Sequence, residues 1–118
     1  MTAVAYKLAD RADWAAARAA GAWRGSAVDR ADGYIHLSTG DQLAATAAKH
    51  YAGQASLVLA TVDLSALGDA LKWEPSRGGD LFPHLYAPLP LAAVTAERDL
   101  SVDADGVMRF DDGGIGWP

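Results

Sequence analysis

The sequence of 118 residues contains no cysteine and fewer basic than acidic side chains. Without cysteine, the chain cannot form a disulfide scaffold, a zinc ribbon, an iron–sulfur cluster or a thiol nucleophile. Ten basic and fifteen acidic residues give a formal net charge of −5. That charge argues against a protein that binds duplex nucleic acid through phosphate contacts, but it leaves room for a small anionic ligand in a local pocket.

Long apolar runs are also missing. No stretch approaches the roughly 18 residues of a membrane span, and residues 1–7 lack the basic start and apolar run of a signal peptide. We therefore expect a cytoplasmic protein that has no membrane partner. The length predicts a single domain over 1–118, because two domains would need roughly 100 residues or more each. We expect its core at about 3–100, with a C-terminal hairpin and tail at 101–118.

Two helices and five to seven short strands are predicted, which is an α+β pattern. Asp10 can cap a first helix that Gly21 ends. Thr39 and Gln42 have the spacing of a capping box for a second helix, which runs to about Tyr51. Residues 22–32 are expected to form a loop. Strands are expected at 3–8, 33–38, 56–63, 71–74, 82–86, 91–98 and 107–110, and the apolar run at 56–63 indicates burial on both faces.

The segment 34–38 carries the first group of candidate functional residues. In a strand, Tyr34, His36 and Ser38 share one face, while the two apolar residues between them face the other way. The polar face can therefore line a cleft. The strand leads into the helix start at Thr39, where free N–H groups and the positive end of the helix dipole suit a phosphate. The alternative is an ordinary strand end and helix cap.

A second group lies at 74–86. His84 and Tyr86 share one face of an extended segment and can clamp a heterocycle or relay a proton; the alternative is an edge strand with a half-buried aromatic ring. Glu74, one of only two glutamates, can orient a ribose hydroxyl or act as a base; the alternative is a solvated charge at a strand end. No histidine has the spacing of a local metal-ligand motif, so no metal site is expected.

Two strings are specific: Asp-Gly-Tyr-Ile-His-Leu-Ser-Thr at 32–39 and Phe-Pro-His-Leu-Tyr at 82–86. Together with Tyr6-Lys7, Trp14 and Gln42, their order and spacing over about residues 4–100 resemble the bacterial domain-of-unknown-function family 952. That family is in turn remotely similar to the ADP-ribosyltransferase superfamily, most closely its RNA 2′-phosphotransferase branch. The resemblance implies an ADP-ribosyltransferase-like fold: a split, curved, mostly antiparallel sheet with two flanking helices and a cleft between the sheet halves.

The resemblance also implies NAD or a related small nucleotide as the ligand, with transfer of an ADP-ribosyl or phosphate group. In that superfamily an early strand carries a histidine that grips the NAD ribose, and this position falls on Lys7. A later strand beside the nicotinamide falls on 35–37, which includes His36. Lys7 is a departure, because it has donors but no acceptor; it can hold a phosphate but cannot copy a neutral imidazole.

The implied roles in the cleft follow from these positions. His36 and Tyr34 would contact the base or ribose, and Glu74 would be the polarising carboxylate. The expected phosphate ligands are Lys7, Ser38 and the helix start at Thr39, and His84 with Tyr86 would form the opposite wall.

Two alternatives stay open. The first is a non-catalytic module that binds a small metabolite or a protein, with Trp23, Trp73, Phe82 and Tyr86 as possible exposed anchors. The second is a two-histidine phosphoesterase, because 36–38 fits a His-x-Ser/Thr half-motif and 84–86 is the second half, with tyrosine in place of the hydroxyl residue. Both enzymatic hypotheses require His36 and His84 to meet in one pocket.

Overall fold

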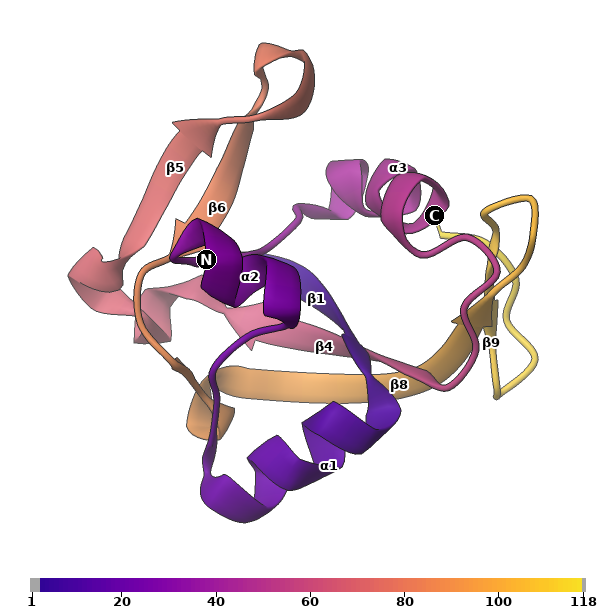
Figure 1. Ribbon diagram of the computed structural model, residues 1–118, viewed down its shortest axis with the longest axis horizontal. Helices are drawn as coiled ribbons and strands as arrows, with labels where there is room; N and C mark the ends of the chain where they lie inside the picture. The colour runs from indigo at the N-terminus through magenta and orange to yellow at the C-terminus, as the bar shows by residue number, and fades with distance from the viewer. Residues whose placement is uncertain (1–2, 118) are drawn as a thin grey trace.

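The computed structural model describes residues 3–117 and shows an α+β protein (Figure 1). Within these residues every strand pair is antiparallel. The α-helices are α1 (Arg11–Ala20), α2 (Ala27–Asp32) and α3 (Gly40–His50). The strands are β1 (Val4–Asp10), β2 (Ala22–Trp23), β3 (Ile35–His36), β4 (Leu57–Asp63), β5 (Leu71–Pro75), β6 (Leu81–Leu85), β7 (Leu89–Pro90), β8 (Val94–Val102) and β9 (Met108–Phe110). Short 3-10 turns are η1 (Leu64–Ala66), η2 (Gly68–Ala70), η3 (Arg77–Gly79) and η4 (Leu91–Ala93).

The strands are divided among three sheets. A four-stranded sheet has the order β1-β4-β8-β9, a three-stranded sheet has the order β3-β6-β5, and β2 pairs with β7. The two larger sheets meet where Tyr6 of β1 and Ser38 exchange backbone hydrogen bonds of 2.8 and 2.9 Å. Figure 1 shows the β5–β6 hairpin extending away from the four-stranded sheet at this junction. The predicted α+β class with mostly antiparallel strands is therefore confirmed.

Strand β4 lies between two hydrophobic clusters, as its apolar run predicts. Alternate side chains of a strand point to opposite faces of the sheet. Val58, Ala60 and Val62 belong to the cluster that includes α1 residues, whereas Leu57 and Leu59 belong to the cluster that includes α3 residues. All five are at most 3% exposed. The prediction of burial on both faces is confirmed.

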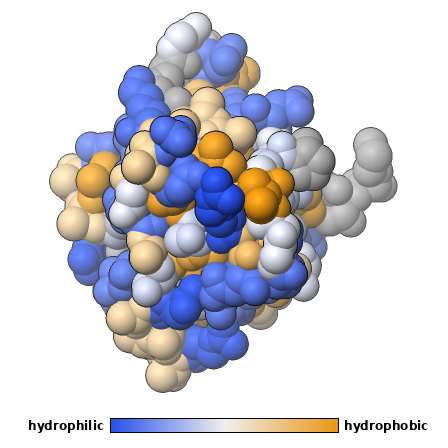
Figure 2. Space-filling view, turned by 90° about the vertical axis from the view of Figure 1, so that its right-hand side faces the viewer, coloured by the Kyte–Doolittle hydropathy of each residue, from blue (hydrophilic) through white to orange (hydrophobic). Residues whose placement is uncertain are grey.

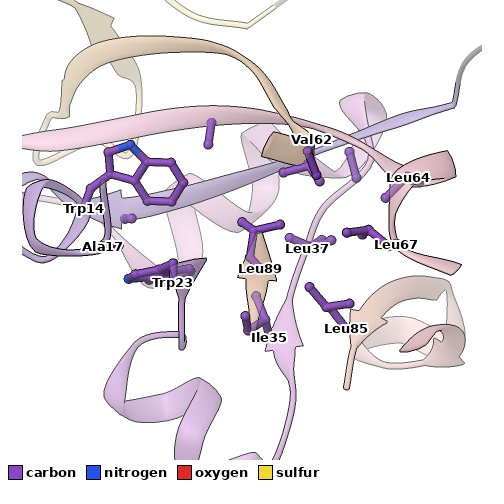
Figure 3. Packing of buried hydrophobic residues seen from close by; sticks show 14 of the residues in the cluster. Trp14, Ala17, Trp23, Ile35, Leu37, Val62, Leu64, Leu67, Leu85 and Leu89 are labelled. Carbon is purple, nitrogen blue, oxygen red and sulfur yellow. The ribbon is translucent and has the colours of Figure 1, made fainter. Parts of the chain in front are cut away.

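The α1-side cluster holds two tryptophans in edge-to-face contact. Trp14 and Trp23 lie with their ring centroids 5.7 Å apart, and Figure 3 shows them beside Leu89 and the other apolar side chains of this cluster. Trp23 is 4% exposed and Phe82 is 8% exposed, so the expectation that these two rings are exposed anchors is wrong. Both rings are buried among other side chains and are not available to a partner.

The two predicted helices begin at the expected capping residues. The Asp10 side chain accepts from the N–H of Asp13 at 3.1 Å, and α1 ends at Gly21 with φ of 85°. Before α3, the Gln42 side chain accepts from the N–H of Thr39 at 3.1 Å. Local capping chemistry thus sets the limits of both helices.

The prediction of a loop over 22–32 is wrong, because this segment forms β2 and the short helix α2. Ser26 and Asp29 make a reciprocal capping box: Ser26 Oγ accepts from the Asp29 N–H, and Asp29 Oδ2 accepts from the Ser26 N–H. Gly25 has φ of +98°, and a Cβ there would lie 2.7 Å from Cβ of Asp29. The described residues therefore hold three α-helices rather than the expected two.

The C-terminal part forms the predicted hairpin, and its tail packs against the rest of the protein. Strands β8 and β9 pair around the turn at 103–106. β8 begins later than expected because η4 precedes it, and the strand expected at 33–38 is only β3. The tail contacts the rest of the protein through Trp117, whose Nε1 donates to the Gly40 carbonyl at 2.9 Å and whose ring packs against Tyr6. Pro118 lies outside the described residues.

Figure 2 shows the side of the molecule that carries the β8–β9 hairpin and the tail. There, hydrophilic side chains surround small groups of hydrophobic ones. Exposed ion pairs lie here: Arg109 pairs with Asp103 within the β8–β9 hairpin, and Arg98 of β8 pairs with Asp112 of the tail. Such pairs contribute little to stability. In the part of the chain from 3 to 117, no helix is long and apolar enough to span a membrane.

Candidate functional site

A pocket of about 490 Å³ lies at the junction of the two larger sheets, and we call it the main pocket. Residues of β1, β3 and β6 line it, and α2 and α3 contribute its other walls. This volume is within the range of small-molecule sites in proteins. His36 and His84 both line the main pocket, with ring centroids 5.5 Å apart.

Strand register brings the two histidines together. His36 pairs with His84 across the β3–β6 ladder, and His84 pairs with Lys72 across the β6–β5 ladder. Partners in an antiparallel ladder share a face of the sheet, so these polar residues lie on one face. The neighbouring pair, Ile35 and Leu85, faces the other way into the hydrophobic core. One apolar face thus fixes the placement of the polar face.

Both ring nitrogens of His36 contact carboxylates of α2. Its Nδ1 lies 2.6 Å from Oδ1 of Asp29, and its Nε2 lies 2.9 Å from Oδ2 of Asp32. The side chain of Asp29 is 2% exposed, whereas that of Asp32 is 47% exposed. The two aspartates are three residues apart, which places them on one side of a helix.

Asp29 also binds the only lysine of β1. Nζ of Lys7 lies 3.0 Å from Asp29 Oδ2 and donates to the carbonyl of His36 at 2.8 Å. Burial by itself raises the pKa of Asp29, but hydrogen bonds from His36 and Ser26 and the charge of Lys7 outweigh it and hold the pKa well below its usual range. Burial lowers the pKa of Lys7, and Asp29 partly offsets this effect.

His84 forms a second histidine–carboxylate pair. It is 2% exposed, and its Nδ1 lies 2.9 Å from Oε1 of Glu74, which also accepts the hydroxyl of Tyr86 at 2.6 Å. Both hydrogen bonds lower the pKa of Glu74, and the one from Tyr86 has the larger effect. The same hydrogen bond is the main reason that the pKa of Tyr86 is raised to about 12. Nε2 of His84 is buried and has no hydrogen-bond partner among residues 3–117.

Tyr34 connects the two pairs. Its ring stacks on His84 with centroids 4.2 Å apart, and it lies 4.6 Å from the ring of His36 and 5.1 Å from that of Tyr86. Burial, followed by the charges of Asp32 and Glu74, raises the pKa of Tyr34.

The two tyrosines also line a second, more open pocket of about 340 Å³, which we call the outer pocket. Arg24 and Arg30 line the outer pocket with Tyr34 and Tyr86, and Asp29 lines both pockets. The two pockets are therefore adjacent.

The structure brings most of the expected site residues together. His36, His84, Glu74, Tyr34 and Tyr86 form one cluster. Lys7 lines the main pocket with its ammonium paired to Asp29, and Ser38 lines it with its hydroxyl 2.9 Å from that of Thr46. Thr39 caps α3 and is not among the described residues that line either pocket.

Sequence reasoning missed Asp29 and Asp32. Asp29 is one of thirteen aspartates, and composition gives none of them a special place. The available signal was the Ser26-x-x-Asp29 spacing, since a capping box would have predicted a helix that directs both aspartates to one side. Among residues 3–117, no three histidine, aspartate or glutamate side chains are grouped so that they could hold a metal ion.

The comparisons with known proteins agree with the architecture. The crystal structure of protein CC0527 from Caulobacter crescentus is 57% identical over 90% of this chain and 93% of that chain, with a TM-score of 0.85. The solution NMR structure of CC0527 is 58% identical over 87% and 89% of the two chains, with a TM-score of 0.76. No protein of curated function matches the chain. Residues 8–97 match the model of a family described as proteins of unknown function, DUF952. The chain therefore belongs to the DUF952 family, as its two specific strings predict.

Proposed function

We propose that the main pocket binds a small nucleotide-like molecule, with NAD as the first candidate, and transfers an ADP-ribosyl or phosphate group from it. One observation carries this proposal: His36 and His84 line the same pocket, 5.5 Å apart, and a carboxylate holds each of them. Two imidazoles at this separation can act on the two sides of one reacting bond, and a carboxylate that orients each ring is a common feature of histidine catalysis.

The charges around the histidines favour an electron-poor reacting centre. Three carboxylates, those of Asp29, Asp32 and Glu74, surround the two rings, and they outnumber the charge of Lys7 and one protonated histidine ring by one. Such a site stabilises positive charge that develops at a ribose carbon when its bond to a leaving group breaks. The excess of negative charge around the histidines therefore favours cleavage of the nicotinamide–ribose bond of NAD beside them, and it disfavours binding of a multiply charged phosphate there.

The phosphates of such a ligand find better partners in the outer pocket. At least two of the three ammonium donors of Lys7 already go to Asp29 and to the His36 carbonyl. Arg24 and Arg30 line the outer pocket and have no ion pair within residues 3–117. Arginine forks suit phosphate oxygens.

The rings of the outer pocket complete the proposed binding mode. A nucleobase stacked on Tyr34 and Tyr86 would lie next to the arginines on one side and next to the histidines on the other. In this arrangement Lys7 is the counter-ion that holds Asp29, and the reacting bond lies beside His36 and His84.

Isothermal titration calorimetry of the purified protein with NAD, ADP-ribose and AMP tests the proposal. We expect heat of binding from at least one of these ligands and its loss in His36→Ala, while Lys49→Ala, an exposed change away from both pockets, keeps it. No heat with any of the three ligands refutes the proposal, and so does heat that His36→Ala leaves unchanged. Release of nicotinamide from NAD indicates ADP-ribosyl transfer, and binding without turnover indicates a non-catalytic binding module.

The register of the histidines favours one second candidate, a two-histidine phosphoesterase. His36 and His84 are direct partners in the β3–β6 ladder, so a phosphate ester between them would meet both rings. The second half-motif lacks a free hydroxyl, because Tyr86 donates its hydroxyl to Glu74. Hydrolysis of cyclic nucleotide phosphates that disappears in His84→Gln would support this candidate, and no hydrolysis would exclude it.

A further inference from the structure

The two histidines of the main pocket have different hydrogen-bond surroundings. Both ring nitrogens of His36 contact carboxylate oxygens, at 2.6 Å to Asp29 and 2.9 Å to Asp32. An ionised carboxylate only accepts hydrogen bonds, so a ring nitrogen at this distance must supply the proton. With a carboxylate oxygen beside each of them, both ring nitrogens of His36 are placed to donate a hydrogen bond.

His84 has only one such partner. Its Nδ1 faces the Glu74 carboxylate at 2.9 Å, so Nδ1 carries a proton. Its Nε2 is buried without a partner among the described residues, and the ring lies 5.5 Å from that of His36. A second positive charge this close to a charged ring is unfavourable. These surroundings favour a ring of His84 with its proton on Nδ1 and an unshared electron pair on Nε2.

We infer that the site holds its two histidines in opposite protonation states, with His36 as the acid and His84 Nε2 as the base. Asp29, Asp32 and Glu74 are then positioning residues that fix the protons on the rings. The substrate of this acid–base pair rests on the function proposed above, whereas the proton pattern is a property of the free protein.

The pattern assigns the proton transfers in the proposed reaction. As an acceptor oxygen bonds to the reacting carbon or phosphorus, its proton passes to Nε2 of His84. The leaving atom takes the electron pair of the bond that breaks. A leaving oxygen also takes one proton from His36, whereas the nicotinamide nitrogen of NAD needs none because it leaves as a neutral ring.

The groups that face each ring keep the pattern in place. His36 faces Lys7 from β1, Asp29 and Asp32 from α2, and His84 from β6. His84 faces Glu74 and pairs with Lys72 of β5, and the rings of Tyr34 and Tyr86 complete its surroundings. The lowered pKa values of Asp29 and Glu74 keep both carboxylates ionised as the pH falls into the mildly acidic range.

Two-dimensional NMR of the ¹⁵N-histidine-labelled, ligand-free protein at neutral pH tests this inference, with the ring signals assigned from single His→Gln variants. We expect both ring nitrogens of His36 in the protonated shift range, and His84 with Nδ1 protonated and Nε2 unprotonated. A neutral His36, or a His84 with a proton on Nε2, overturns the inference.

Substitutions at the exposed carboxylates sharpen the test without touching the core. Asp32→Asn should move the Nε2 signal of His36 away from the protonated shift range, because the carboxylate charge that accepts from Nε2 is lost. Glu74→Gln should let a proton reach Nε2 of His84, since an amide can donate to Nδ1. Asp80→Asn, an exposed change outside both pockets, should alter neither ring. Unchanged rings in Asp32→Asn and Glu74→Gln would show that these carboxylates do not position the protons.

The NMR test needs no ligand, so it can fail independently of the proposed function. If the proton pattern is found and no nucleotide binds, the acid–base assignment stands and the proposed ligand is wrong. If a nucleotide binds and the pattern is absent, the ligand stands and the assignment is wrong.

Discussion

The ion pair between Lys7 and Asp29 allows a quantitative test of what holds the main pocket together. Both side chains are at most 6% exposed. Removing one partner of a buried pair costs about 3–5 kcal/mol when the other charge is left without compensation. In Lys7→Met the ring of His36 still contacts Asp29, so we expect the lower end of this range. Lys7→Met keeps most of the side-chain volume, so its loss of stability should come from the stranded Asp29 carboxylate. A domain of this size has a stability of about 5–15 kcal/mol, so the variant should fold but be markedly weaker.

The double variant Lys7→Met/Asp29→Asn separates charge from packing. It removes both charges. The N–H groups of Ser26 and His36 donate to different oxygens of Asp29, so the one amide oxygen of asparagine can keep only one of these hydrogen bonds. We therefore expect a loss of about 1–3 kcal/mol, the value for imperfectly satisfied polar groups. The double variant should therefore be more stable than Lys7→Met alone. If the loss of stability in the double variant equals the sum of the losses in the two single variants, the two charges do not compensate each other.

Urea unfolding followed by tryptophan fluorescence is a suitable assay, because Trp14 and Trp23 pack against each other in the core. Equal denaturant slopes in all variants would confirm that only stability, and not the extent of unfolding, has changed. The pair also predicts a pH dependence. The folded-state pKa of Asp29 lies below its unfolded value of about 3.9, so its contribution to stability is present above that pH and is lost as the pH falls through the folded-state pKa.

Comparison with Asp29→Asn isolates this contribution from that of the other carboxylates, which titrate in both proteins. The difference in stability between the wild type and Asp29→Asn should shrink as the pH falls from about 5 to about 2. A difference that stays constant over this range would contradict the low pKa of Asp29.

Two further predictions concern local contacts. Glu74→Gln should lower the pKa of Tyr86 from about 12 toward the usual value of about 10, which ultraviolet absorbance during an alkaline titration measures; no movement would show that the Glu74 hydrogen bond is not the cause. Gly25→Ala should destabilise the fold more than Gly21→Ala, because both positions have a positive φ but only Gly25 places a Cβ against Asp29. The backbone conformation alone costs about 1–2 kcal/mol at either position, so equal losses in urea unfolding would show that the Asp29 contact relaxes freely.

The parts of the fold that the sequence predicts are those set by local chemistry. Asp10 and Gly21 limit α1, and Thr39 and Gln42 start α3, because side-chain caps and left-handed glycines act within a few residues. Helix α2 escaped prediction because it has six residues, no apolar stripe, and a capping box with aspartate in place of glutamate or glutamine. Contacts with β3, rather than propensity, hold such a short helix in place.

The sequence predicts which residues belong to the candidate site, but it does not predict which of them contact each other. Alternation along 82–86 correctly places His84 on the polar face, yet Glu74 reaches it only through the register of the β5–β6 hairpin. Likewise His36 meets His84 because β3 pairs with a strand almost fifty residues away. These pairings depend on the packing of the opposite face, which single-residue patterns do not contain.

Asp29 shows why stability and chemistry must be tested at different residues of this site. Its carboxylate accepts from Lys7 of β1, from the N–H of Ser26, and from the backbone and ring of His36. One buried side chain therefore joins β1, α2 and β3 and also sets the protons on His36. Any change at Asp29 alters the fold and the reactive ring together, so a loss of activity there cannot identify a chemical role. Asp32 contacts the same ring from an exposed position, and a change there can alter the protons on His36 while β1, α2 and β3 stay joined.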